Sequence, residues 1–316
     1  MSATNTLVTG ASGFIGTHLV ARLLSEGSGV IVLARSSSVL PAEWRDRVRI
    51  IACDDFSESN LRRLVDAPIE AVFHLAACGV KPNQRDIDEM LRVNIEMPAA
   101  LVRLCAEWRA SMVMAGTFSE YRSPSAQNLV TEDSALEQGK LYGSSKAAGG
   151  LMASAIARSC GVGFRLLRFF KVYGAGEAPH RLLPAIVSGL AKHERVAISA
   201  GTQVLDFVYI DDVIEAMMRA QAHCREKSDI ATWNVATGRA HSVREFAEQV
   251  ASAMNADASL LGFGAVAMRN DDEPWLVGSP DRLLSELGWQ PSIGLETGVR
   301  AAVAALRRRQ AREQLT

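Results

Sequence analysis

Short apolar runs alternate with longer amphipathic stretches over the first half of the chain. The runs are rich in Val, Ile and Leu, and they predict strands at 6–10, 29–34, 48–53, 71–77, 110–116 and 162–170. Apolar residues at helical spacing predict helices between several of them, at 13–24, 58–66, 84–109 and 142–160. Unbroken apolar strands that alternate with helices are typical of an α/β fold with a doubly wound parallel sheet, buried on both faces.

The rhythm changes after Tyr173. Helices are expected at 179–191, 211–224 and 295–312, with short strands at 196–199 and 206–210. Asp211 and Asp212 are expected to cap and start the middle helix. The pattern predicts two units, one at 1–173 and a smaller, mixed α/β unit at 174–316. Part of the second unit, about 206–240, is expected to return to the main sheet through a strand near Asn234.

Composition and charge narrow the class of protein. The chain has 316 residues, of which 48% are hydrophobic and 22% charged, and its net charge is -1. This balance gives no electrostatic reason to expect nucleic acid or a membrane surface as a partner. The five cysteines are dispersed, and no run reaches the roughly 18 apolar residues of a membrane span. We expect a soluble cytoplasmic enzyme without a signal peptide, and the spacing of the six histidines predicts no metal site.

Three glycines follow the first predicted strand and open the first predicted helix. Gly10, Gly13 and Gly16 stand in G-x-x-G-x-x-G spacing, and Phe14 and Ile15 fill the last gap. A pyrophosphate can approach such a turn closely because glycine has no Cβ, and the helix N-terminus offers it free N–H groups. We therefore expect a dinucleotide-binding Rossmann domain at 1–173 and a mainly substrate-binding domain at 174–316.

The end of the second strand discriminates between NAD and NADP. An acidic residue there normally accepts hydrogen bonds from the adenosine ribose hydroxyls of NAD. In this chain the place is Ala34, followed by Arg35 and three serines that begin with Ser36. A guanidinium and hydroxyl groups suit a 2′-phosphate, which a carboxylate would repel. The sequence therefore favours NADP(H) over NAD(H). The alternative is that Arg35 is only a solvated loop residue.

The end of the third strand carries a second adenosine prediction. Asp55 is expected to accept from the adenine amino group, with Phe56 beside the ring. On residue type alone, an ordinary loop that caps the next helix is an equally good interpretation.

The segment LYGSSKAAGG places Tyr142 and Lys146 four positions apart on one helix face. A tyrosine hydroxyl is a poor acid–base catalyst at neutral pH, and a neighbouring ammonium is expected to lower its pKa. The same ammonium can hold the ribose of a bound cofactor. The pair alone is common by chance, but here it follows a glycine-rich turn and the strand-ending segment VMAGTFSEY.

Together these motifs resemble the short-chain dehydrogenase/reductase superfamily, in particular its extended branch that acts on nucleotide sugars. The matching segments span nearly the whole chain: TGASGFIG, VFHLAA, RVNIEMPAALV, AGTFSEY, YGSSK, LRFFKVYGAGE, DFVYIDDV and LGWQP. The resemblance implies hydride transfer between the nicotinamide and a sugar carbon, with Tyr142 as the acid–base and Lys146 as its electrostatic partner. Thr117 would bond the substrate oxygen beside Tyr142, although a buried strand-end hydroxyl is the alternative.

The resemblance also implies cofactor contacts along one strand end, from Leu75, Ala76 and Ala77, and a supporting role for Asn94. For Asn94, a hydrogen bond at a helix start is an equally good interpretation. His74, which ends the same predicted strand, is expected to be structural rather than catalytic.

Departures from the family pattern narrow the reaction. The 4,6-dehydratases of this branch carry acidic residues directly after the threonine, where this chain has Phe118 and Ser119, with Glu120 one position later. Elimination needs a well-placed acid and base, so the sequence argues against a standard dehydratase.

The substrate side also departs from the pattern. Lys171 replaces the usual asparagine before VYG, and Leu205 replaces the usual arginine before DF. Arg269 matches the place of a second family arginine, and Lys171, Arg181 and Lys192 are candidates to compensate for the missing one against the substrate diphosphate. The alternative for Lys171 is an ion pair with Glu177. Phe118 is expected beside the sugar.

The sequence thus predicts an NADPH-dependent reductase of a nucleotide-linked 4-keto-6-deoxyhexose. A nucleotide-sugar 4-epimerase with tightly bound NAD is the alternative, and reductases of other carbonyls come third. A non-enzymatic NADP sensor would be expected to lack part of the set Thr117, Tyr142 and Lys146, which is complete here. The resemblance further implies a homodimer whose four-helix bundle is built from the helices at 84–109 and 142–160.

Overall fold

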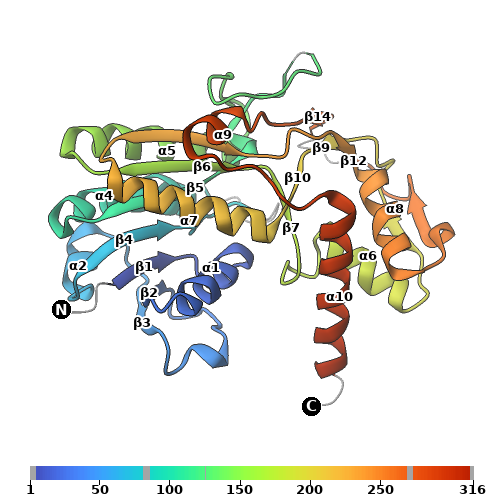
Figure 1. Cartoon of the computed structure of the whole chain (residues 1–316), viewed down its shortest axis with the longest axis horizontal. Coiled ribbons are helices and arrows are strands. Elements are labelled where there is room, and N and C mark those ends of the chain that lie inside the picture. Colours follow the sequence, from blue (N-terminus) through green and yellow to red (C-terminus); the bar gives the residue numbers. More distant parts are fainter. Residues whose placement is uncertain (1–4, 81–85, 125, 269–272, 314–316) are drawn as a thin grey trace.

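A seven-stranded parallel sheet forms the centre of the molecule (Figure 1). The computed structural model describes residues 5–80, 86–124, 126–268 and 273–313. Across the sheet the strands are β11 (Ile230–Val235), β6 (Phe164–Phe169), β5 (Ser111–Thr117), β4 (Ile69–His74), β1 (Asn5–Thr9), β2 (Gly29–Ala34) and β3 (Arg49–Ala52). Every pairing is parallel, which confirms the predicted doubly wound sheet. β11 is the strand expected near Asn234, and it pairs with β6 along its whole length.

Helices cover both faces of this sheet. Residues next to one another on a strand face opposite ways, so Leu7 and Val8 belong to two different hydrophobic clusters. One face packs against α1 (Phe14–Ser25) and α7 (Ile210–Glu226), and α7 lies across the front of the sheet in Figure 1. The other face packs against α2 (Glu58–Leu64), α4 (Met97–Trp108) and α5 (Leu141–Cys160).

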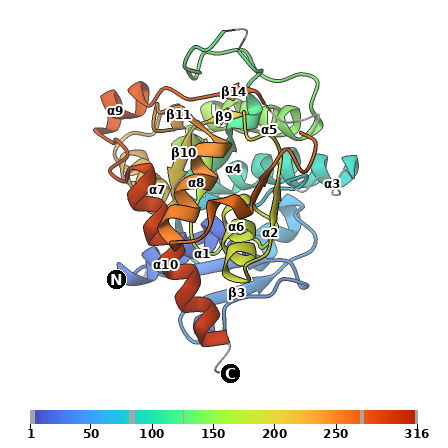
Figure 2. The same ribbon diagram turned by 90° about the vertical axis from the view of Figure 1, so that its right-hand side faces the viewer.

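Short strands and three longer helices make up the C-terminal lobe, which lies nearest the viewer in Figure 2. Its helices are α6 (Leu182–Ala191), α8 (Val243–Met254) and α10 (Leu295–Glu313). The small sheets are β7 (Lys171–Tyr173) with β10 (Phe207–Tyr209), β8 (Val196–Ile198) with β13 (Leu261–Phe263), and β12 (His241–Ser242) with β9 (Val204–Leu205) and β14 (Trp275–Leu276). The division of the chain at residue 173 stays a prediction. No helix in the described ranges is long and apolar enough to cross a bilayer.

The helix predicted at 84–109 is divided in the structure. Within the described part of that range, α3 (Ile87–Leu91) leads into a π-helical turn, η2 (Arg92–Glu96), and then into α4. Pro98 stands at the start of α4 and has no N–H to donate to the carbonyl of Asn94 four residues earlier. The missing hydrogen bond accounts for the wider turn. The remaining short helical elements are η1 (Ala42–Trp44), η3 (Phe118–Glu120), η4 (Ala258–Leu260) and α9 (Asp281–Leu287).

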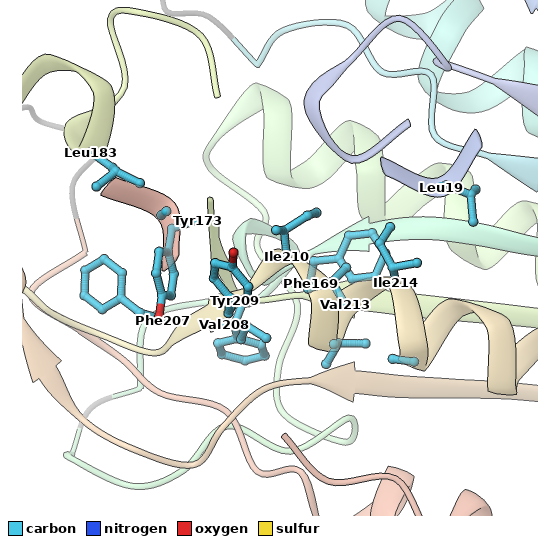
Figure 3. Packing of buried hydrophobic residues seen from close by; sticks show 14 of the residues in the cluster. Leu19, Phe169, Tyr173, Leu183, Phe207, Val208, Tyr209, Ile210, Val213 and Ile214 are labelled. Atoms are coloured by element: carbon cyan, nitrogen blue, oxygen red, sulfur yellow. The ribbon is translucent and has the colours of Figure 1, made fainter. Parts of the chain in front are cut away.

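One hydrophobic cluster runs without a break from the main sheet into the C-terminal lobe (Figure 3). Leu19 of α1 and Leu183 of α6 lie at its two ends in that view. Aromatic rings fill the junction: Phe207 stacks on Phe246 with 4.3 Å between ring centroids, and Tyr173 meets Phe246 edge to face at 5.3 Å. This packing fixes the lobe against the sheet and so fixes the width of the space between them.

Two buried aspartates tie distant segments to this junction. The carboxylate of Asp206 accepts from the Thr237 hydroxyl at 2.6 Å and from the backbone N–H groups of Thr237, Gly238 and Gly278. Burial raises the pKa of Asp206 to about 6, so it is ionised at neutral pH and can accept from all four donors. Asp212 was predicted only to start a helix. Its side chain also accepts from the backbone and hydroxyl of Ser292 and from Ile293, which anchors the approach to α10.

Asp206→Asn is expected to lower the free energy of unfolding by about 2–4 kcal/mol, because an amide group turns donors toward four existing donors in a buried site. The measurement is urea unfolding followed by circular dichroism. Asp211→Asn is the matched control, since Asp211 is exposed on the first turn of α7, and it should change stability by less than about 1 kcal/mol. Equal losses in the two variants would contradict the assignment of Asp206 as a structural tie.

Candidate active site

A cavity of about 760 Å³ lies along the carboxyl ends of the central strands. Its wall takes residues from the ends of β1, β2, β4, β5 and β6, and it is closed on the other side by the segment that leads into α6. A volume of this size suits a small-molecule ligand, and the carboxyl edge is where open α/β sheets bind theirs.

The glycine-rich turn forms one end of the cavity. All three glycines line it, as do Phe14 and Ile15 between the last two. Gly10 has a φ of +68°, and a Cβ there would lie 2.5 Å from the backbone of Ala76. A Cβ on Gly16 would lie 2.3 Å from the Gly10 carbonyl oxygen. No side chain caps the N-terminus of α1. The turn therefore has the close backbone packing and the unblocked helix start that a pyrophosphate requires.

Two of the four residues that were predicted to contact the adenosine of the cofactor lie on the cavity wall near the end of β2, a region called the adenosine end below. Arg35 and Phe56 line the cavity. Ser36 and Asp55 are not part of the lining. The backbone N–H of Ser36 donates to Asp54 at 3.0 Å, and the carboxylate of Asp55 accepts from the N–H and hydroxyl of Ser57. Contact of Ser36 or Asp55 with a cofactor stays a prediction.

Asp54 is a neighbour of Arg35 that the sequence did not single out. Hydrogen bonds from Ser36 hold the pKa of Asp54 below its usual range, and the charge of Arg35 acts in the same direction. The adenosine end thus carries both a guanidinium and a carboxylate at its exposed rim. Ser38, which the sequence left among the unspecified serines, also lines the cavity.

Thr117, Tyr142 and Lys146 meet at the middle of the cavity. Thr117 ends β5, and the other two lie on the first turns of α5. The Thr117 hydroxyl lies near enough to the Tyr142 hydroxyl to act on its pKa, and it accepts from the N–H of Ser119 at 3.2 Å. Lys146 is buried, and only 2% of its surface is exposed. The three residue types that the sequence picked out are therefore within reach of one bound molecule.

The small residues of α5 explain this proximity. A Cβ on Gly143 would lie 2.0 Å from the carbonyl oxygen of Ser119, and one on Gly149 would lie 1.8 Å from that of Asn94. The helix backbone therefore touches η3 and η2 directly. Any larger residue at either position would push Tyr142 away from Thr117.

The protonation state of Tyr142 differs from the one expected. Burial raises its pKa to about 12, and the charge of Glu120 adds to the shift, while Arg181 and the hydrogen bond of Thr117 oppose it. Burial also lowers the pKa of Lys146, against an opposing effect of Glu120. The expected lowering of the tyrosine pKa is thus wrong for the protein alone, because burial outweighs the opposing effects of Arg181 and Thr117. Tyr142 holds its proton at neutral pH and can donate it.

Asn94 supports the wall instead of lining it. Its side-chain amide donates to the carbonyl of Cys78 at 3.0 Å and to the hydroxyl of Ser145 at 2.9 Å, and its oxygen accepts from the N–H of Cys78. The residue fastens the loop after β4 to α5. Leu75, Ala76 and Ala77 of that loop line the cavity beside the glycine turn, where the family resemblance placed them.

The substrate-side predictions are divided. Phe118 and Arg181 line the cavity, and Lys171 lies in β7 outside the lining. The charge of Lys171 opposes the increase in pKa that burial causes in Glu177, and an ion pair between the two stays a prediction. Arg269 lies outside the described residues. Glu177 itself lines the cavity and accepts from the N–H of Gly174 at 3.1 Å, and sequence reasoning did not place it there.

Other acidic groups were missed as well. Asp86 and Glu89, at the start of α3, line the same cavity beside Cys78. Burial raises the pKa of the Cys78 thiol, and Glu89 adds to the effect. One sequence signal could have placed these acids in the cavity. They follow the fourth predicted strand, and in a Rossmann fold the segment after a strand lies at the carboxyl edge of the sheet.

His74 has the structural place that was expected. It is fully buried at the end of β4, its Nδ1 lies 2.8 Å from the Thr9 hydroxyl oxygen, and burial lowers its pKa to about 3. It does not line the cavity, and neither does His180, which is exposed.

Nucleotide-sugar enzymes of similar length share the fold of this chain. A family model described as the NAD dependent epimerase/dehydratase family matches residues 6–236. CDP-abequose synthase from Salmonella typhimurium is 24% identical over 301 residues, covering 93% of this chain and 95% of that protein. UDP-glucose 4-epimerase from Mycolicibacterium smegmatis is 29% identical, covering 96% and 98%. The solved structure of MoeE5 in complex with UDP-glucose and NAD is 30% identical, with a TM-score of 0.84 over 97% of this chain and 99% of that one.

Proposed function

The chain belongs to the NAD dependent epimerase/dehydratase family, and from that premise we propose that it is an NADPH-dependent reductase of a nucleotide-linked 4-keto-6-deoxyhexose. Its relatives are NAD(P)-dependent enzymes of the extended short-chain dehydrogenase/reductase type, and they act on nucleotide sugars. The direction of reaction, the cofactor and the sugar are the parts that we add.

The observation that carries the proposal is that Thr117, Tyr142 and Lys146 line one cavity whose dehydratase positions hold no acid. A ketone that accepts hydride needs one proton on its oxygen, and a neutral tyrosine hydroxyl within reach supplies it. Phe118 follows Thr117 on the cavity wall where a dehydratase has an acid. Glu120, the only acid in that turn, is fully buried and does not line the cavity. Elimination of a hydroxyl therefore lacks an acid at the positions that a dehydratase uses, whereas reduction needs only the proton donor Tyr142 and a bound hydride donor.

The residues present fit a nicotinamide dinucleotide. The glycine turn and the start of α1 would hold the pyrophosphate, and Lys146 would hold the nicotinamide ribose. The bound cofactor supplies the hydride to the sugar carbonyl carbon. Thr117 and Tyr142 orient the carbonyl oxygen, and the Tyr142 hydroxyl proton passes to it as the new C–O–H group forms. The charge on Lys146 stabilises the phenolate that remains until solvent returns the proton.

NADPH is proposed because β2 ends in Ala34 without a ribose-binding acid, and Arg35 and Ser38 line the cavity directly after it. A 2′-phosphate would take charge-assisted hydrogen bonds from this pair.

A nucleotide-sugar 4-epimerase with retained NAD is the second candidate. Two observations favour it: relatives of that name are similar along the whole chain, and Asp54 places a carboxylate beside Arg35. In an epimerase, the ring of the bound keto-sugar has to turn over in the cavity between the two hydride transfers. The cationic side chains of Lys171 and Arg181, together with the predicted Arg269, are proposed to bind the substrate diphosphate in either reaction.

We further propose a homodimer in the cytoplasm. The outer face of α5 exposes Leu151 by 58% and Met152 by 50%, and the adjoining α3 exposes Ile87 by 56% and Leu91 by 44%. Apolar side chains exposed on two neighbouring helices are typical of a helix-bundle interface. The five free cysteines fit a reducing compartment.

Leu151→Glu is expected to convert the dimer into a monomer, because a carboxylate would be buried opposite its own copy in a two-fold interface. Sedimentation velocity measures the change. Ser159→Glu, on the exposed end of the same helix, should leave the assembly unaltered. A wild-type protein that sediments as a monomer at all concentrations would refute the dimer.

Tyr142→Phe is expected to lower the rate of NADPH oxidation with a nucleotide-linked 4-keto-6-deoxyhexose by at least about 100-fold, since the proton donor is lost. The dissociation constant for NADPH should change by less than about threefold, because the ring keeps its place. Stopped-flow fluorescence of the nicotinamide reports both quantities. Turnover that survives the substitution would exclude Tyr142 as the donor, and a wild-type protein that turns over no 4-keto sugar would exclude the reductase.

A further inference from the structure

A four-residue segment after β7, residues 174–177, connects the cavity wall to α1 and is called the strap below. Glu177 at its end lines the cavity, and so does Arg181, which follows the strap just before α6. The glycine turn and Phe14 line the same cavity from the side of α1. A dinucleotide held by the glycine turn would therefore lie against a wall whose position depends on the strap.

His18 of α1 is joined to the strap by a hydrogen bond between residues 157 positions apart in the chain. Its Nε2 lies 2.8 Å from the carbonyl oxygen of Ala175, and since a carbonyl oxygen can only accept, Nε2 carries the proton. His18 does not itself line the cavity. The hydrogen bond thus holds the strap from outside the space that a ligand would fill.

The ring of Phe14 adds packing to this contact between α1 and the strap. It meets the His18 ring edge to face, with 5.6 Å between the ring centroids. A Cβ on Gly176 would lie 3.6 Å from Phe14 and 3.7 Å from Nε2 of His18. A Cβ on Gly174 would lie 2.6 Å from the side chain of Ile210. The strap is therefore packed between the first turns of α1 and the first residue of α7.

The strap also has a fixed internal shape. Gly176 has a φ of +97°, a conformation that residues with a side chain rarely adopt. The carboxylate of Glu177 accepts from the N–H of Gly174 at 3.1 Å, which closes the turn on itself. Because the turn is short and closed, a hydrogen bond at Ala175 fixes all of it, including the glutamate on the cavity wall.

We propose that His18 is a positioning residue for the dinucleotide, because its hydrogen bond to the strap holds the wall of Glu177 and Arg181 against the bound cofactor and slows the release of that cofactor. The inference rests on the proposed function in that the ligand is a nicotinamide dinucleotide on the glycine turn. It adds a residue outside the cavity that determines how long the cofactor stays bound. His18 acts through the strap.

The first test is the rate at which NADPH leaves the protein when no substrate is present. Excess NADP+ displaces the bound NADPH, and stopped-flow fluorescence of the nicotinamide follows the release. His18→Ala is expected to increase the release rate about fivefold, the effect of one lost hydrogen bond. His18→Gln should stay within about twofold of the wild type, because its side-chain amide can donate to the same carbonyl.

Ser25→Ala is the matched control on the same helix. Ser25 is exposed at the far end of α1, where its hydroxyl donates to the carbonyl of Arg22 at 2.7 Å. Its removal should leave the release rate unchanged. An unchanged rate in His18→Ala would overturn the proposal, as would an equal increase in Ser25→Ala. The proposal also fails if His18→Gln releases NADPH as fast as His18→Ala does.

Amide hydrogen exchange of the emptied protein measures the strap directly. Residues 174–181 should exchange at least about threefold faster in His18→Ala than in the wild type or Ser25→Ala, since local opening is easier. Gly176→Ala is a second variant that leaves α1 intact and strains the strap at its positive φ. It should increase both the exchange and the release of NADPH. Faster exchange with an unchanged release rate would overturn the role of His18 in holding the cofactor.

These outcomes are separate from those that test the reductase. Neither measurement involves a sugar substrate, so a wild-type protein that reduces no 4-keto sugar leaves the comparison of variants intact. A wild-type protein that prefers NADH undergoes the same displacement with NADH and excess NAD+. Equal release rates in that experiment would overturn the proposal for His18, whereas the reductase is judged from turnover alone.

Discussion

The close contact between the backbone of α5 and the turns beside it is the constraint on which the site depends. Gly143 and Gly149 have no room for a Cβ, because the carbonyl groups of Ser119 and Asn94 occupy that space. This contact brings Tyr142 to the end of β5. It also places Lys146 next to the sheet, where its side chain is buried away from water. The burial that follows raises the pKa of Tyr142 and lowers the pKa of Lys146. Packing of small residues is thus the cause, and the chemistry of the tyrosine is the consequence.

Buried charged groups also hold the strands and loops around the cavity in place. Glu120 with Arg168 ties β5 to β6, and Asp206 joins the loop after β11 to the start of the C-terminal lobe. Each carboxylate accepts hydrogen bonds from backbone N–H groups and from a threonine hydroxyl or a buried arginine, so its position is fixed. The cavity therefore has rigid walls on the Rossmann side and on the lobe side, which suits the precise placement that hydride transfer requires.

The sequence was sufficient for the parts of the molecule that depend on local pattern. The sheet strands, the glycine turn and the helix that carries Tyr142 and Lys146 were all recognisable from periodicity and spacing. Features made by distant partners were not. The π-turn at Arg92–Glu96 follows from Pro98 and its contact with α5, and the partners of Asp206 stand 31 and 72 positions away. Neither spacing nor residue type shows where such contacts form. The position of Glu177 on the cavity wall likewise depends on the fold, because its loop lies over the glycine turn. A Cβ added to the neighbouring Gly176 would lie 3.6 Å from the side chain of Phe14.

We propose that this chain uses an exchangeable NADPH and consumes it. This is tested by the cofactor content of the purified protein, followed by fluorescence titration of the emptied protein with NADPH and with NADH. We expect little retained cofactor and at least about tenfold tighter binding of NADPH than of NADH, because Arg35 can form charge-assisted hydrogen bonds with the 2′-phosphate. Stoichiometric NAD that leaves only on denaturation, or a preference for NADH, would exclude the exchangeable NADPH and favour the epimerase.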